Sequence, residues 1–182
     1  MHPGNMSHHG GSRTGRLEGP GDWQGDGRPA FLSEAERPRY ALASSEGFEH
    51  TTEGRTTTSE PADGQEAYLL ATDRRILVFL GDRPAEPDVE IAYELVAECR
   101  LDGGLLSTTV AVETREESVA FDPSAGDAAA TVEFAQAMAS HWRELATQLS
   151  DARDAIETIE SGADVSNYDV TRAREHISAA RA

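Results

Sequence analysis

The chain contains no lysine. All 16 of its basic residues are arginine, and they stand against 33 acidic residues, which gives a net charge of -17. Such an excess of acid repels itself at low ionic strength, whereas near 1 M salt the Debye length falls to about 3 Å and the repulsion is screened. The composition therefore indicates a salt-rich cytoplasm such as that of a halophilic archaeon. An anionic surface also repels phosphate backbones and acidic headgroups, so we expect no nucleic-acid partner and disfavour lipid binding.

Cysteine and long apolar runs are nearly absent as well. Cys99 is the single cysteine, which excludes an internal disulfide and fits a reducing interior. We interpret it as a small buried hydrophobe rather than a catalytic thiol, because it lies among apolar residues in a predicted strand. No apolar run approaches the roughly 18 residues that a membrane helix needs, and the N-terminus has no signal-peptide pattern. We expect a cytoplasmic protein without an integral membrane segment.

Motifs for catalysis and for ligand binding are lacking too. There is no Gly-x-Ser-x-Gly elbow, and "GGSRTG" lacks the Gly-Lys-Ser/Thr ending of a phosphate-binding loop. The histidines are either in a glycine-rich tail or isolated from one another, so we expect no metal site. They are His2, His8, His9, His50, His141 and His176. The sequence predicts no cofactor and no enzymatic activity.

The first 30 residues have the composition of a tail, rich in glycine and proline. Their three arginines balance three acids, so the whole excess of -17 lies in residues 31–182. We place a domain boundary near residue 30. Met6 is an alternative to Met1 as the start of the chain.

Alternating apolar and polar residues predict a series of antiparallel strands after the tail. Two are separated only by Thr-Asp-Arg-Arg, and a later pair is joined by a hairpin at Asp102, Gly103 and Gly104. A helical turn is predicted at residues 31–36, and the polar residues 45–65 contain one candidate edge strand at 56–59. The other strands are expected at 40–44, 67–72, 75–80, 89–93 with its pattern continuing to 101, 106–113 and 119–121.

An amphipathic helix of about twenty residues follows, with Asp127 as its N-cap. Such a helix must lay its apolar side over an open end or face of the sheet. Its apolar positions recur at steps of three or four and are Val132, Ala135, Met138, Trp142, Leu145 and Leu149.

Residues 150–182 are expected to form a separate helical hairpin, with helices at 151–160 and 169–180 broken near Gly162. In this hairpin we expect Ile156 and Ile159 to meet Tyr168, Val170 and Ile177. It has little surface of its own to bury, so it must dock on its own domain or on another chain. The sequence leaves open a structural tail in cis and an oligomerisation or partner hook in trans.

Several segments together resemble the bacterial-type pleckstrin-homology-like domains, the group that includes the GRAM-like and YokE-like families. They are "LLATDRRILVF", "IAYELVAECRLDGG", "TTVAVET", "VAFD" and the long helix. The resemblance covers about residues 34–146, and its most specific part is Thr72, Asp73, Arg74 and Arg75, which match the Thr-Asp-x-Arg hairpin of that group. It implies a mainly β domain over residues 31–149. About seven antiparallel strands would form a bent sandwich or partly open barrel, capped by the C-terminal helix. The C-terminal hairpin resembles in outline the SHOCT module, although it lacks the leucine-rich and Thr-Glu-Glu-Phe pattern.

Two roles are open for the hairpin arginines. Thr72 and Asp73 can accept hydrogen bonds from nearby backbone amides and so close the turn without glycine. Arg75 is then expected to place its guanidinium on a carboxylate or a strand-end carbonyl. Alternatively, Arg74 and Arg75 bind an anion such as a phosphate.

Many pleckstrin-homology domains bind phosphoinositides through basic residues between their first two strands. Here residues 45–65 hold five acids and only Arg55, so lipid binding is not carried over. We expect a non-catalytic binding or assembly module that uses a sheet edge or the groove beside the helix to hold a protein partner or a second copy. The alternative is a peripheral membrane or lipid-sensing domain, which fold analogy alone suggests.

Overall fold

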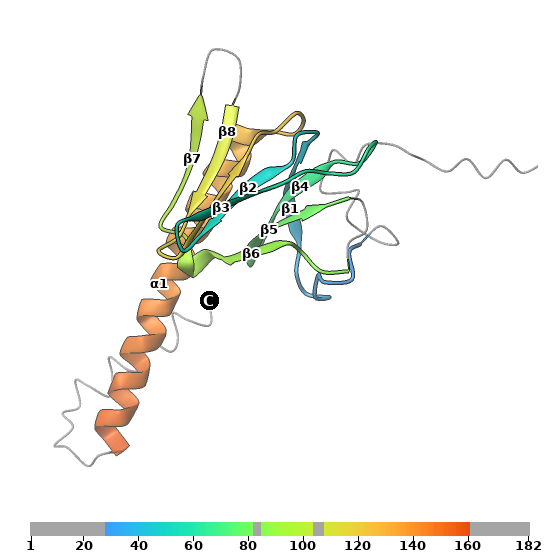
Figure 1. The fold of residues 1–182 in the computed structure, drawn as a ribbon. Helices are drawn as coiled ribbons and strands as arrows, with labels where there is room; N and C mark the ends of the chain where they lie inside the picture. The colour runs from blue at the N-terminus through green and yellow to red at the C-terminus, as the bar shows by residue number, and fades with distance from the viewer. Residues whose placement is uncertain (1–27, 82–84, 104–107, 161–182) are drawn as a thin grey trace, which may run out of the picture.

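The computed structural model describes residues 28–81, 85–103 and 108–160. In this part of the chain nine strands form two antiparallel sheets, followed by the single long helix α1 (Ala128–Glu160) (Figure 1). The prediction of a mainly β fold with a C-terminal helix is confirmed. The sheets do not close into a barrel, and there are nine strands rather than about seven. The strands are β1 (Pro38–Ser44), β2 (Phe48–Thr52), β3 (Arg55–Ser59), β4 (Ala67–Thr72), β5 (Arg75–Leu80), β6 (Val89–Ala92), β7 (Glu98–Gly103), β8 (Thr108–Glu113) and β9 (Glu117–Phe121).

The first sheet has the strand order β1-β4-β5-β6. The bounds of β4 and β5 are those predicted. All six residues of β4 are buried because both faces of this sheet are covered. Alternate residues such as Leu69 and Leu70 belong to two different apolar clusters, one between the sheets and one under the segment that contains Leu32. This double burial explains why β4 and β5 read as nearly continuous apolar runs.

The second sheet has the order β3-β2-β9-β8-β7. Its strand β2 was not predicted, because "FEHTT" buries only Phe48 and carries no apolar alternation. This segment is a strand because it pairs with β3 on one side and with β9 on the other. His50, for example, lies opposite Thr57 of β3 and opposite Val119 of β9. The predicted edge strand at 56–59 is confirmed as β3, at the end of the sheet.

The chain passes from the first sheet to the second through a short 3-10 helix, η3 (Tyr93–Leu95). The strand predicted at 89–93 is confirmed as β6, whereas the predicted continuation of its pattern to 101 was wrong, because η3 interrupts it. Tyr93 is fully buried, and its ring anchors the point at which the chain turns between β6 and β7. The helical turn predicted at 31–36 is also wrong. Two successive turns, closed by Leu32 N to Pro29 O and Glu36 N to Ser33 O, take its place.

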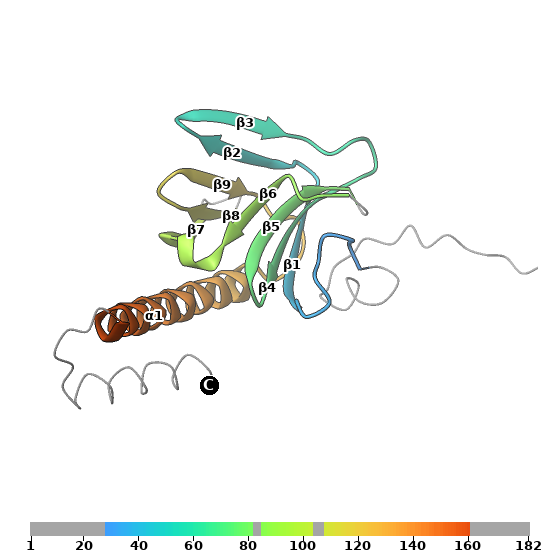
Figure 2. The same cartoon turned by 90° about the horizontal axis from the view of Figure 1, so that it is seen from below.

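Helix α1 begins as predicted, since the Ala130 amide donates to Asp127 Oδ1 at 3.0 Å. Its first half packs against the core between the sheets, where Val132, Ala135 and Ala139 are buried. The predicted end near residue 149 was wrong, because "LSDARDA" contains neither glycine nor proline and the helix continues to Glu160. The far half of the helix is residues 143–160, and Figures 1 and 2 both show the C-terminal part of α1 extending past the ends of both sheets. The second predicted helix, at 169–180, lies outside the described residues.

No helix among the described residues combines the length and the apolar character that crossing a membrane requires. The hairpin predicted at Asp102–Gly104 lies partly outside the described residues, although the pairing of Gly103 with Thr108 joins β7 and β8 in antiparallel register.

Candidate functional site

The predicted hairpin motif is organised around a buried carboxylate from a distant segment. Glu36 is only 1% exposed. Arg75 donates from Nε to Glu36 Oε1 and from Nη2 to Oε2, both at 2.9 Å, and Nη2 also donates to the Phe31 carbonyl at 3.0 Å. On its other side, Nη1 of Arg75 lies 2.6 Å from Glu90 Oε1. The guanidinium therefore has the predicted environment of carboxylates and a backbone carbonyl.

The charges of this pair stabilise each other. Burial alone would raise the pKa of Glu36, but the hydrogen bonds from Arg75 and Thr72 outweigh it and hold that pKa below its ordinary value. The hydrogen bond to Glu36, assisted by Glu90, raises the pKa of Arg75 above its ordinary range. A further anion at Arg75 would have to displace one of these carboxylates. The geometry thus favours architecture over anion binding at this residue.

Thr72 closes the turn without glycine, as predicted. Its Oγ1 accepts hydrogen bonds from the amides of Arg74 and Arg75, both at 3.0 Å. The hydroxyl proton faces Glu36 Oε1 at 2.9 Å and the Arg75 carbonyl at 3.0 Å. The carbonyl of Thr72 accepts from the buried hydroxyl of Tyr93 at 2.8 Å. One threonine thus joins the turn, the buried carboxylate and the start of η3.

Asp73 has a different role from the predicted one. Because Thr72 already holds both nearby amides, Asp73 does not close its own turn. Its Oδ1 accepts from the Arg37 amide at 2.9 Å, and its own amide donates to the Arg37 carbonyl at 3.0 Å. This reciprocal pair fastens the hairpin to the residues before β1. Local sequence gives no signal for it, since the partners are far apart in the chain.

Arg74 is exposed, and none of its side-chain nitrogens makes a hydrogen bond or ion pair within the described residues. The structure therefore leaves anion binding at Arg74 as a prediction.

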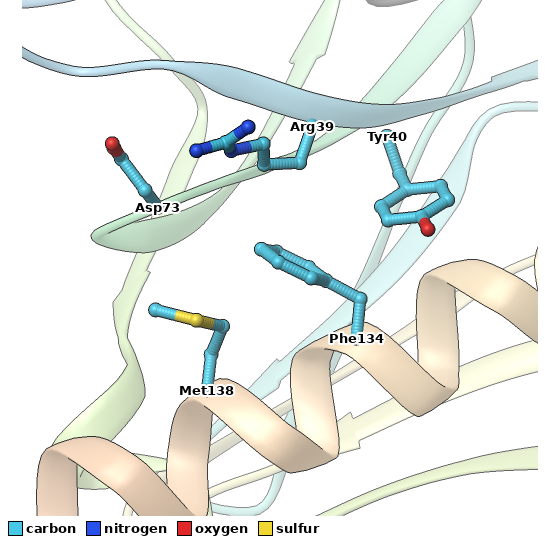
Figure 3. Close-up of a pocket in the computed structure, with 5 residues that line it drawn as sticks. All are labelled: Arg39, Tyr40, Asp73, Phe134 and Met138. Carbon is cyan, nitrogen blue, oxygen red and sulfur yellow. The ribbon is translucent and has the colours of Figure 1, made fainter.

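A shallow pocket of about 400 Å³ lies beside the hairpin, between β1 and α1. Figure 3 shows two helix side chains on one side of it, Phe134 toward Tyr40 and Met138 toward Asp73, with Arg39 on the strand above them. The rings of Tyr40 and Phe134 are 5.3 Å apart. The pocket combines an apolar floor with one charge of each sign at its rim.

The helix residues predicted to cap the core divide into two groups. Val132 and Ala135 are buried in it, whereas Met138 and Trp142 are half-buried and pack against its edge. Leu145 is half-buried on the far half of α1.

A longer groove runs along the other side of α1. Two adjoining pockets, of about 320 and 630 Å³, share Val96, Ala97 and Arg143. The smaller reaches Cys99 under the helix, where Gln136 Nε2 donates to the Cys99 carbonyl at 2.7 Å. The larger is lined by η3 and by the turn between β8 and β9, with residues Glu94, Leu95, Thr114, Arg115, Glu116 and Glu117. The sequence predicts a groove beside the helix, but it gives no signal that these residues of η3 and of the β8–β9 turn line it.

A buried thiol and a histidine–glutamate pair lie beside this groove. Burial raises the pKa of the Cys99 thiol to about 11, so the thiol remains protonated at neutral pH. His50 Nε2 lies 2.7 Å from Glu117 Oε2 and 3.1 Å from Thr52 Oγ1. His50 and Thr52 lie on β2, and Glu117 lies on the paired strand β9. The described residues contain no group of three or more histidine, cysteine, aspartate and glutamate side chains placed to hold a metal ion.

No protein family matches the chain, and no curated protein is similar to it. What the structure defines is a two-sheet, mainly β domain with one long C-terminal helix.

Proposed function

We propose that this chain is a non-catalytic, cytoplasmic protein-binding module that holds a segment of a partner protein in the groove beside α1. The observation that carries the proposal is the pair of joined pockets between α1, η3 and the β8–β9 turn. Leu95, at the rim, is 59% exposed. A large apolar side chain beside a concave surface is the usual arrangement of a docking site.

The charges around the groove suggest the partner's chemistry. Its lining carries two arginines, Arg115 and Arg143, together with four acids, Glu94, Glu98, Glu116 and Glu117. Arg143 is held in place by its Nε, which donates to the Ala139 carbonyl at 3.1 Å. Neither arginine forms an ion pair with a described residue. A partner segment with an apolar residue next to an acid would bury its side chain against Leu95 and pair its carboxylate with an arginine.

A peripheral membrane role has weaker support. The hairpin of β2 and β3 would be the lipid-facing element in the pleckstrin-homology-like group, and it carries Glu49 and Glu53 against Arg55. We propose membership of that group on the hairpin motif, and the two sheets with a C-terminal helix support it. The lipid-binding property does not follow from it.

A display library of random short peptides, selected on the full chain in molar KCl, tests the groove. Leu95→Glu should weaken the selected peptides at least about tenfold, equivalent to about 1.4 kcal/mol. Leu101→Glu is the matched control, because Leu101 is 37% exposed and does not line the groove. Absence of enrichment, or equal loss in both variants, would overturn the proposal. Flotation of the protein with anionic vesicles at the same salt concentration tests the alternative function, lipid binding.

A further inference from the structure

The far half of α1 has an apolar seam that the two sheets do not reach. Leu149 is 58% and Ile156 is 44% exposed, and Figures 1 and 2 show this part of the helix beyond both sheets. Together with Leu145, Ala152 and Ile159, these residues recur at steps of four, three, four and three. This is the spacing at which one helix packs along another.

Two observations on the same half indicate a neighbour. Ala152 is only 5% exposed. Oε1 of Gln148 is buried and has no hydrogen-bond partner within the part of the chain that the structure describes, while its Nε2 donates to Glu144 Oε1 at 3.5 Å. A buried acceptor without a donor is costly unless a partner supplies one. The sheets end before this point, so a neighbouring stretch of polypeptide would account for both the cover over Ala152 and the missing donor.

We propose that the neighbour is residues 169–180 of the same chain, forming a second helix antiparallel to the far half of α1. This segment has its own apolar seam, Val170, Ala173, Ile177 and Ala180, at steps of three, four and three. It contains no proline or glycine. It has too little apolar surface to be stable alone, so it needs a helix to pack against.

The two seams fit in one antiparallel register, in which every pair of facing residues has the same sum of residue numbers. Large side chains then meet small ones in three of the four layers, as close packing of two helices requires. The layers are Ile159 with Val170, Ile156 with Ala173, Ala152 with Ile177, and Leu149 with Ala180. The burial of Ala152 agrees with a large residue over it.

Charge complementarity favours this occupant over a second copy of α1. The far half carries five acids, Glu144, Asp151, Asp154, Glu157 and Glu160, against Arg143 and Arg153. Residues 169–182 carry three arginines, Arg172, Arg174 and Arg181, against Asp169 and Glu175. Two copies of the acidic far half would repel each other, whereas the arginine-bearing segment is attracted to it.

The connection between the two helices is long enough for this arrangement. Residues 161–168 are eight in number and include Gly162. Paired helices lie 8–10 Å apart, and eight residues span up to about 26 Å when extended. A short tether also gives the segment a high effective concentration at its own helix, which favours pairing within one chain.

Disulfide trapping in the full chain tests the register. Ile156→Cys with Ala173→Cys puts two thiols in one proposed layer, whereas Asp154→Cys with Ala173→Cys puts the first on the opposite side of α1. Cys99 stays in both, because its thiol is buried and protonated. The first pair should close within the monomer at least about tenfold faster than the control, as measured by mass spectrometry of alkylated samples in molar KCl.

Equal rates for the two pairs would overturn the proposal, and so would a disulfide between two chains, which would assign the seam to a second copy. Because the cysteine pairs lie away from the groove beside η3, this result does not depend on the proposed function. Circular dichroism of both reduced variants checks that each retains the fold.

Discussion

Glu36 and Arg75 lie 39 positions apart in the chain and form a two-pronged ion pair, with both oxygens of the carboxylate at 2.9 Å from nitrogens of the guanidinium. The pair joins the segment before β1 to the hairpin between β4 and β5. Its contacts extend to Thr72 on one side and Glu90 on the other. The hairpin motif is therefore a structural junction, and its arginine is committed to that junction.

Arg75→Ala should destabilise the protein by about 3–5 kcal/mol, because it leaves the Glu36 carboxylate buried without a partner. Arg74→Ala is the matched control and should stay within about 0.5 kcal/mol, since its side chain is exposed. Chemical denaturation in molar KCl measures both. Similar midpoints for Arg75→Ala and the parent protein would contradict the structural role.

The same pair predicts a dependence of stability on pH. The pKa of Glu36 in the folded protein lies below its ordinary value of 4.5. Its contribution is therefore fully present above pH 4.5 and is lost as the pH falls through the folded pKa. The free energy of unfolding of the parent protein should exceed that of Glu36→Gln at neutral pH, and the difference should shrink below pH 4.5. A difference that stays constant down to acid pH would argue against a charged Glu36.

Tyr93→Phe should cost about 1–3 kcal/mol, because it leaves the Thr72 carbonyl without its buried donor while keeping the volume of the ring. Tyr40→Phe provides the comparison. Its hydroxyl makes no hydrogen bond within the described residues, and its loss should be nearly neutral. Thermal melts of the two variants would distinguish them, and equal melting temperatures would count against the Tyr93 bond.

Gly47→Ala and Gly54→Ala separate two effects at positive φ. Both glycines lie in the left-handed region, at φ of 92° and 75°. A Cβ at Gly47 would lie 1.9 Å from the Ser59 carbonyl oxygen, whereas one at Gly54 would meet open space. We expect Gly54→Ala to lower the free energy of unfolding by about 1–2 kcal/mol through backbone strain alone. Gly47→Ala should lower it by more. Comparable losses in urea denaturation would mean that β2 and β3 adapt to the extra atom.

The local sequence pattern was sufficient to predict an element where its residues are strongly buried and where the residues that close its turn lie within that turn. The bounds of β4 and β5 follow from two apolar runs on either side of Thr72, whose hydroxyl closes the turn by itself. The start of α1 at Asp127 is equally local. In each case the residues that form the interaction are three positions apart or fewer.

Pairing between distant segments was not predictable in the same way. Strand β2 is polar and exists because β3 and β9 lie on either side of it. Glu36 has the appearance of a surface acid in the sequence, and only its pairing with Arg75 accounts for its burial. Asp73 was assigned to its own turn because its true partner, Arg37, is 36 residues away.

The continuation of α1 beyond the sheets has a geometric consequence. With a rise of 1.5 Å per residue, the 18 steps from Trp142 to Glu160 carry the chain about 27 Å outward from the domain. Each residue also rotates the end of the helix by about 100°. Insertion of one residue would thus redirect whatever is attached at the tip, whereas insertion of seven would mainly lengthen the spacer and preserve its orientation.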